Sequence, residues 1–232
     1  MNSGYEESLD KNFSRAYNLC TGNFSCEELF GLLKNGNMPE KQFAALEISS
    51  LNNQSEADIL MGNLTGCDGK IREAVAFKIS ELIRADKSFF YKYPDIFADA
   101  TIDINANICR IIIECLNYLK DDSGFSKIYT DKILKFIDDA LNALDGFIFR
   151  DKKYTINKQL FKLYWCLEGI NVFFENLDEN TLVEPLKRCA EVEEYTIREK
   201  VALILKHSIK TEQLINLKKH LKNDSNYYVK NV

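Results

Sequence analysis

The chain has 232 residues, of which 46% are hydrophobic and 28% are charged, and this balance excludes an intrinsically disordered protein. Only 10 Gly and 3 Pro are present, which argues against folds with many tight turns, such as β-sandwiches and barrels. The formal net charge is -5, from 35 acidic and 30 basic residues. Proteins that wrap nucleic acid are usually basic because phosphate neutralisation supplies most of their affinity, so the bulk charge argues against that class.

The first 23 residues predict an N-terminal capping helix. Leu9, Phe13, Ala16 and Tyr17 share one helical face, and arrays of stacked helices need atypical units at their ends. This segment has no apolar run preceded by basic residues, so it does not resemble a secretory signal. No stretch of the chain approaches the ~18 apolar residues that a membrane-spanning helix needs. We therefore expect a soluble, cytoplasmic protein with no membrane partner.

The apolar spacing after residue 23 is helical nearly everywhere, with the three- and four-residue steps of an amphipathic helix. Strand-like alternation is absent from the sequence. Ser25, Pro39, Ser55 and either Asp178 or Asn180 are typical residues for a helix start. Helices are expected in chain order at 26–34, 40–51, 56–64, 71–82, 88–100, 108–119, 129–144, 156–167, 181–190, 197–208 and 211–221.

Five of these segments can be stacked in one register, which indicates an internal repeat. The segments at 40–51, 71–82, 108–119, 156–167 and 197–208 are mostly apolar at their first, fifth, ninth and twelfth positions. Each follows another amphipathic segment, so the predicted unit is a helical hairpin that recurs every ~30–45 residues. A sixth copy begins at Tyr228 and is cut off by the end of the chain, so the last repeat is incomplete.

The turn that precedes each second helix resembles that of HEAT repeats, which place an Asp, a few polar residues, a β-branched residue and then Arg. The matching positions are Asp224 with Val229 and Lys230, Asp103 with Ile108 and Cys109, Asp151 with Ile156 and Asn157, Asp68 with Ile71 and Arg72, and Ile197 with Arg198 after an acidic turn. Pro94 and Pro185 also fall in first helices, where HEAT repeats tolerate proline. The resemblance covers residues 24–232. It implies an all-α, right-handed α-solenoid of about five hairpins, in which the Asp and Arg or Lys side chains form a structural ladder.

In that register, the positions expected to face a concave groove are the third, sixth and tenth of each second helix. They are Gln42, Ala45, Ser49, Glu73, Ala76, Ser80, Arg110, Ile113, Asn117, Lys158, Phe161, Trp165, Glu199, Ala202 and Lys206. The candidate partner-binding residues among them are Arg110, Lys158, Phe161, Trp165, Glu199 and Lys206. Arg and aromatic residues are favoured at binding hot spots. Aromatic residues at helical spacing more often belong to a core, however, and burial of Phe161 and Trp165 is the alternative.

Motifs for catalysis and for metal or cofactor binding are absent from the sequence. The seven cysteines form no C-x-x-C pair, and neither His207 nor His220 lies beside a cysteine, so zinc and disulfide frameworks are not expected. We expect reduced, mostly buried cysteines. No P-loop, H-E-x-x-H or G-x-S-x-G motif is present. His207 is expected to cap a helix end, and acidic pairs such as Asp138-Asp139 are expected to be solvated.

The sequence thus predicts a non-enzymatic scaffold or adaptor, without cofactor or metal, that grips a protein or peptide in its groove. The alternative is a nucleic-acid-binding protein similar to the HEAT-like DNA-alkylation-repair glycosylases. The Trp-Trp-Asp-type segment of those enzymes has no counterpart here, because Trp165 is followed by Cys-Leu-Glu. No catalytic residue is therefore carried over. A third prediction is self-association through apolar surface at the C-terminal end of the array.

Overall fold

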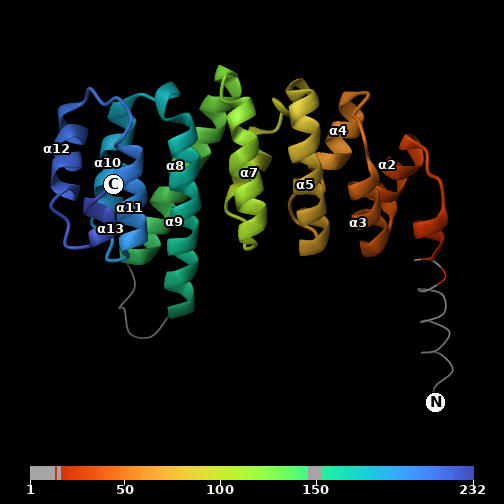
Figure 1. The fold of residues 1–232 in the computed structure, drawn as a ribbon, viewed down its shortest axis with the longest axis horizontal. Coiled ribbons are helices and arrows are strands. Elements are labelled where there is room, and N and C mark those ends of the chain that lie inside the picture. The colour runs from red at the N-terminus through yellow and green to blue at the C-terminus, as the bar shows by residue number, and fades with distance from the viewer. Residues whose placement is uncertain (1–13, 15–16, 146–152) are drawn as a thin grey trace, which may run out of the picture. The chain divides into compact units, whose positions relative to one another are not determined.

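The computed structural model describes residues 14, 17–145 and 153–232, and within them the chain is helical and contains no strand (Figure 1). No described helix is both long and apolar enough to cross a membrane. The predicted capping helix lies largely outside the described residues, although Ser14 and residues 17–21 are helical. In that helix Leu19 is buried, whereas Tyr17 is 62% exposed and does not pack as expected.

The chain divides into two compact units, residues 1–89 and 90–232. The first contains α2 (Cys26–Asn35), α3 (Met38–Glu47), α4 (Gln54–Met61) and α5 (Gly69–Ala85). Helix α2 packs against α3 and α4, and α3 packs against α5. Ser25 and Asn37 each form a reciprocal capping box at their helix start, with Glu28 and Glu40. The predicted start at Ser55 is wrong, because Asn53 accepts the capping hydrogen bond instead.

The second unit is built from successive hairpins. Its helices are α6 (Pro94–Thr101), α7 (Ala106–Leu119), α8 (Ser123–Asp145), α9 (Lys153–Phe173), α10 (Glu179–Ala190), α11 (Tyr195–Ile204), α12 (Glu212–Leu221) and α13 (Tyr227–Lys230), with a 3-10 turn η2 (Phe174–Asn176). Helix α6 packs on α8, α8 on α10 and α10 on α12, while α7 packs on α9, α9 on α11 and α11 on α13. The hairpin pairs α6–α7, α8–α9 and α10–α11 join these two rows of helices (Figure 1).

Proline explains the main difference between the expected and observed helices. A single helix was expected over 88–100, whereas the structure has a 3-10 turn η1 (Lys87–Phe90) and then α6, which starts at Pro94. Proline disfavours the helical conformation of the residue before it and is well tolerated in a first turn. Pro185, in contrast, lies inside α10. The other expected helices are present with shifted ends: α8 begins six residues earlier than predicted, α9 ends six residues later, and α3 and α11 each end four residues earlier.

Aromatic side chains fill the middle of the second unit. Phe97, Phe125, Tyr129 and Phe173 are fully buried, and their ring centroids lie 5.0–6.2 Å from their neighbours. The Tyr129 hydroxyl is 3.0 Å from the Thr101 hydroxyl, so this buried polar group has a partner. It also lies against Gly169 of α9, where a Cβ would collide with it. The absence of a side chain at residue 169 therefore lets α9 approach α8 closely.

Candidate interaction surface

The expected groove residues of the second unit lie on one row of helices, α7, α9 and α11. Arg110 and Lys158 are exposed, Phe161, Trp165 and Glu199 are half-buried, and the exposed Lys206 follows the end of α11. We call the outward face of these three helices the α7–α9–α11 surface; besides these residues, it includes Ile113, Asn117, Glu168, Val172 and Ala202.

The corresponding positions of the first unit are less accessible. Ala45 of α3 and Ala76 of α5 are fully buried, although the register places both at the centre of the expected groove row. Alanine at a helix–helix contact lets the backbones approach closely, and α3 and α5 do pack against each other. The exposed positions of the predicted row are therefore found mainly in the second unit.

Helix α9 has two distinct faces. Leu163, Cys166, Leu167 and Ile170 are fully buried on the face that packs into the unit. Trp165 is two residues from Leu163, which on an α-helix is a rotation of about 200°, so it lies on the opposite face. The helical wheel thus places Trp165 outward, and its partial burial comes from neighbouring side chains rather than from the core.

On α9, the Trp165 ring contacts two other aromatic rings. The Trp165 ring meets Phe161 edge-on at 6.1 Å and Tyr164 edge-on at 5.2 Å between ring centroids. The Trp165 Nε1 atom is buried and has no hydrogen-bond acceptor among the described residues. An unpaired buried N–H group costs about 1–3 kcal/mol, and native proteins contain few of them. Among the side chains of the described residues, Trp165 Nε1 is the one buried nitrogen or oxygen atom without a hydrogen-bond partner.

A shallow valley of about 540 Å³ lies between the C-terminal halves of α7 and α9 and begins at Glu168, about one helical turn beyond Trp165. Ile113 and Asn117 line it from α7, as the groove register predicts. The residues from α9 and η2 that line it were not predicted: Glu168, Asn171, Val172, Glu175 and Asn176. Extending the same register by two turns of α9, to match its real length, would have found Glu168 and Val172.

Lys200 of α11 connects α11 to α9 through contacts with two α9 side chains, Glu168 and Tyr164. Its ammonium group donates a hydrogen bond to the Glu168 carboxylate and lies 4.6 Å from the centre of the Tyr164 ring. Burial lowers the pKa of Lys200, but the hydrogen bonds and charges of Glu168 and Tyr164 together outweigh burial and leave the pKa above its usual value. Tyr164 is the same ring that contacts Trp165, so this ion pair also helps to position the indole.

His207 does not have the expected capping role. Helix α11 ends at Ile204, and the His207 side chain instead packs across the turn. Its Nε2 atom is 3.0 Å from Oδ1 of Asn171, and its ring stacks on Phe174 with 4.7 Å between centroids. His207 thus lines the valley just after the end of α11, where its side chain contacts Asn171 of α9 and Phe174 of η2.

The far end of the surface is basic. Lys206 lies with Lys218, Lys222 and Lys230 around a small hollow of about 260 Å³ whose apolar lining includes Leu221 and Val229. None of the described ion pairs involves these lysines. The surface therefore changes from mixed polarity beside α7 to positive charge beside α12.

The predicted ladder of Asp and basic residues is present between α11 and α13. Arg198 of α11 binds Asp224, which precedes α13, through two hydrogen bonds. At another step Cys109 replaces the basic residue, and its thiol donates to the Asp103 carbonyl instead. Asp151 lies outside the described residues. These residues are structural, since they connect turns of successive hairpins.

Nothing in the described part of the chain groups three or more His, Cys, Asp or Glu side chains in a way that could hold a metal ion. All seven cysteines are free thiols. Cys109, Cys115, Cys166 and Cys189 are buried, as expected for small apolar residues, whereas Cys20 is exposed.

Comparison with known proteins leaves the chain without a family assignment. No protein-family model and no curated protein matches it. Among solved structures, the chain is similar to an engineered protein whose crystal structure was determined by the Northeast Structural Genomics Consortium, with a TM-score of 0.44 and 12% sequence identity. That match covers 90% of this chain and 93% of the engineered protein.

Proposed function

We propose that the chain is a right-handed, HEAT-like α-solenoid that serves as a non-enzymatic scaffold and binds a polypeptide segment on the α7–α9–α11 surface. The solenoid proposal is supported by the second unit, in which α6–α7, α8–α9 and α10–α11 pack as hairpins and each hairpin packs against the next. The seven free thiols are consistent with a cytoplasmic location.

The observation that carries the binding proposal is the environment of the Trp165 side chain. A half-buried indole on the outward face of a helix, with an aromatic neighbour and with an open valley that begins one helical turn further along α9, matches the composition of binding hot spots. Its N–H group has no acceptor, and a partner that turns the ring outward can supply a backbone carbonyl. Binding would then remove a cost that the free protein carries.

The competing proposal is nucleic-acid binding, and the four lysines around Leu221 are the observation that favours it. The two proposals differ in their salt dependence. A phosphate-dominated complex loses affinity steeply with salt, whereas a hot-spot interface is much less sensitive. A third outcome is self-association at the α12–α13 end, which would depend on protein concentration.

The experiment is affinity capture from a native lysate at two salt concentrations, with and without nuclease, followed by titration of the captured polypeptide. Trp165 is the chain's only tryptophan, so its fluorescence reports on this site alone. The double variant Trp165→Ala with Lys158→Ala has no tryptophan, so it and the control are compared by anisotropy of the fluorescein-labelled polypeptide. We expect the double variant to bind at least tenfold more weakly. Ile128→Ala, an exposed apolar residue on α8, is the matched control and should bind within twofold of wild type.

The proposal fails in two distinguishable ways. If the double variant binds as tightly as the control, the partner uses another surface. If capture yields nucleic acid that is lost at the higher salt concentration, the competing proposal takes its place. Circular dichroism at 222 nm and thermal melting establish that each variant is folded.

A further inference from the structure

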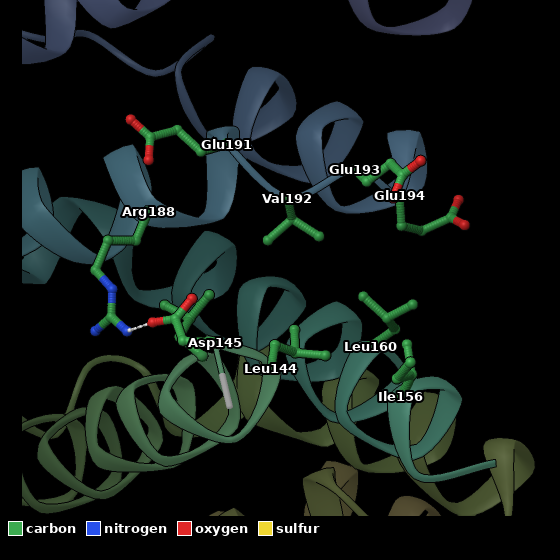
Figure 2. A pocket seen from close by; sticks show the side chains of 10 residues that line it. Leu144, Asp145, Ile156, Leu160, Arg188, Glu191, Val192, Glu193 and Glu194 are labelled. Atoms are coloured by element: carbon green, nitrogen blue, oxygen red, sulfur yellow. Dashed lines mark hydrogen bonds and ion pairs between the residues drawn. The ribbon is translucent and has the colours of Figure 1, made fainter. Parts of the chain in front are cut away.

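A second, separate hollow of about 500 Å³ lies where the C-terminal end of α8, the N-terminal half of α9 and the α10–α11 turn meet (Figure 2). Leu141 and Leu144 line it from α8, and Ile156 and Leu160 line it from α9. Val192 points down into it from the α10–α11 turn, towards Leu144 (Figure 2). We call this hollow the α8–α10 slot. Its floor is made of five aliphatic side chains, of which Leu144, Leu160 and Val192 are only half-buried.

The rim of the α8–α10 slot is acidic. Glu191, Glu193 and Glu194 follow one another along the α10–α11 turn, with Val192 between the first two, and Asp145 lies on the opposite side (Figure 2). Glu191 and Glu193 are exposed. Asp145 and Glu191 stand at the C-terminal ends of α8 and α10, whereas Glu194 caps the N-terminus of α11, so the partial charges of the helix ends around the rim oppose one another.

Among the described residues, Arg188 is the one cation that lines the slot, and it is already engaged. Arg188 donates to Asp138 at 2.7 Å, to Asn142 at 2.8 Å and to Asp145 at 3.0 Å. It therefore neutralises carboxylates of α8. At the α10–α11 turn, Glu194 caps α11 and lies near the Arg198 guanidinium, whereas none of the described ion pairs involves Glu191 or Glu193. Within the described residues, the slot thus presents an aliphatic floor with two exposed carboxylates on its rim.

We infer that the α8–α10 slot is a binding site for a cationic peptide segment that inserts a large apolar side chain between flanking Lys or Arg residues. The apolar anchor fits the aliphatic floor, and the flanking cations complement Glu191 and Glu193. This site is independent of the α7–α9–α11 surface. Leu160 and Trp165 are five residues apart on α9, a rotation of about 140°, so they face different ways.

The test uses a fluorescein-labelled synthetic peptide, GRKLFKRG, titrated with the full chain and followed by fluorescence anisotropy. Two unlabelled competitors separate the two parts of the site: GEELFEEG reverses the charge, and GRKSSKRG removes the anchor. We expect GRKLFKRG to bind, and each competitor to be at least tenfold weaker. Trp165 fluorescence should stay unchanged, which distinguishes this site from the one proposed above.

Two charge-matched double variants then locate the site. Glu191→Lys with Glu193→Lys should weaken GRKLFKRG at least tenfold. Glu184→Lys with Glu212→Lys changes the net charge equally at exposed positions away from the slot, and should weaken it less than threefold. Val192→Ser should also weaken binding, without any change in charge, and thermal melting checks that all variants fold.

Several results would overturn the inference. The absence of GRKLFKRG binding, equal binding of GRKSSKRG, or equal weakening by both charge variants would each do so. If GRKLFKRG binds only after residues 147–149 are replaced by Gly-Ser-Gly, the ligand of the slot is a segment of this chain. If the affinity for GRKLFKRG depends on the concentration of the protein, the ligand of the slot is a second copy of the chain.

Discussion

Arg198 and Asp224 lie 26 residues apart in the sequence and form a bidentate ion pair. Arg198 Nε is 2.7 Å from Oδ2 of Asp224, and Nη2 is 3.1 Å from Oδ1. The two side chains are only 14% and 11% exposed. Arg198 also donates to the carbonyls of Val192 and Glu193, so one guanidinium connects the α10–α11 turn to the residues before α13.

Asp224→Asn should destabilise the protein by about 2 kcal/mol at pH 7, because it leaves Arg198 without its charged partner. The hydrogen bond from Arg198 holds the pKa of Asp224 below its usual value. A depressed folded-state pKa stabilises the fold above the unfolded pKa of about 3.9, and this contribution is lost as pH falls towards the folded pKa. Urea unfolding at pH 7 and pH 3 should therefore show a smaller difference between variant and wild type at pH 3.

The control for this variant is Asp131→Asn, which removes an exposed pair with Lys127 and should cost less than about 0.5 kcal/mol. An equal effect of Asp224→Asn at both pH values would contradict the pairing, since an isosteric packing defect does not titrate.

Gly169→Ala should destabilise the protein by about 1–3 kcal/mol. Alanine is normally favoured over glycine in a helix by about 1 kcal/mol, but here the new methyl group meets the Tyr129 hydroxyl, which is fully buried and bonded to Thr101. Gly31→Ala in α2 is the matched control, because nothing lies within 4 Å of the added carbon. It should be neutral or stabilising in thermal melting, and destabilisation of both variants alike would contradict this account.

Thiol labelling with Ellman's reagent at pH 8 should separate the cysteines into two classes. Burial raises the pKa of Cys109 and Cys189 to about 12, and it also raises the pKa of Cys166. Because the thiolate is the reactive form, these three and the buried Cys115 should label only when the protein unfolds. The exposed Cys20 should react first, followed by Cys26 and Cys67. Rapid labelling of all seven in the native protein would be inconsistent with the core described here.

Trp165→Phe should change the free energy of unfolding by less than about 1 kcal/mol. The substitution loses apolar contact area but also removes a buried donor that has no acceptor, and these two effects oppose each other. Trp165→Ala removes the same donor but loses much more apolar contact area, and it should cost more. Chemical denaturation of both variants makes the comparison, and a cost for Trp165→Phe as large as that for Trp165→Ala would mean that the indole N–H has a partner in solution.

Much of the fold could be predicted from the sequence because helical periodicity is a local signal. The segments at 108–119 and 181–190 are helices almost to the residue, and Ser25 caps α2 as expected. Where two polar residues compete for a cap, as Asn53 and Ser55 do, the sequence alone could not choose. The exposure of Tyr17 was also missed, because its environment depends on contacts outside its own helix.

The candidate site was predictable only in part. The register placed Ile113 and Asn117 beside the valley, since outward positions repeat with the helical period. It could not show that Ala45 and Ala76 would be buried, because that depends on how closely α3 and α5 pack. The α8–α10 slot was missed altogether: Val192 and Leu144 are 48 residues apart, and no local pattern brings them together.

The most direct test of the scaffold proposal is site-specific photocrosslinking from Lys158, which is exposed on α9 beside Phe161. A benzoylphenylalanine at this position, and a control at Ile128 on α8, would be irradiated in native lysate with and without nuclease. The proposal predicts discrete polypeptide adducts from residue 158 that resist nuclease and are absent from residue 128. Adducts that disappear with nuclease, or identical adducts from both positions, would contradict it.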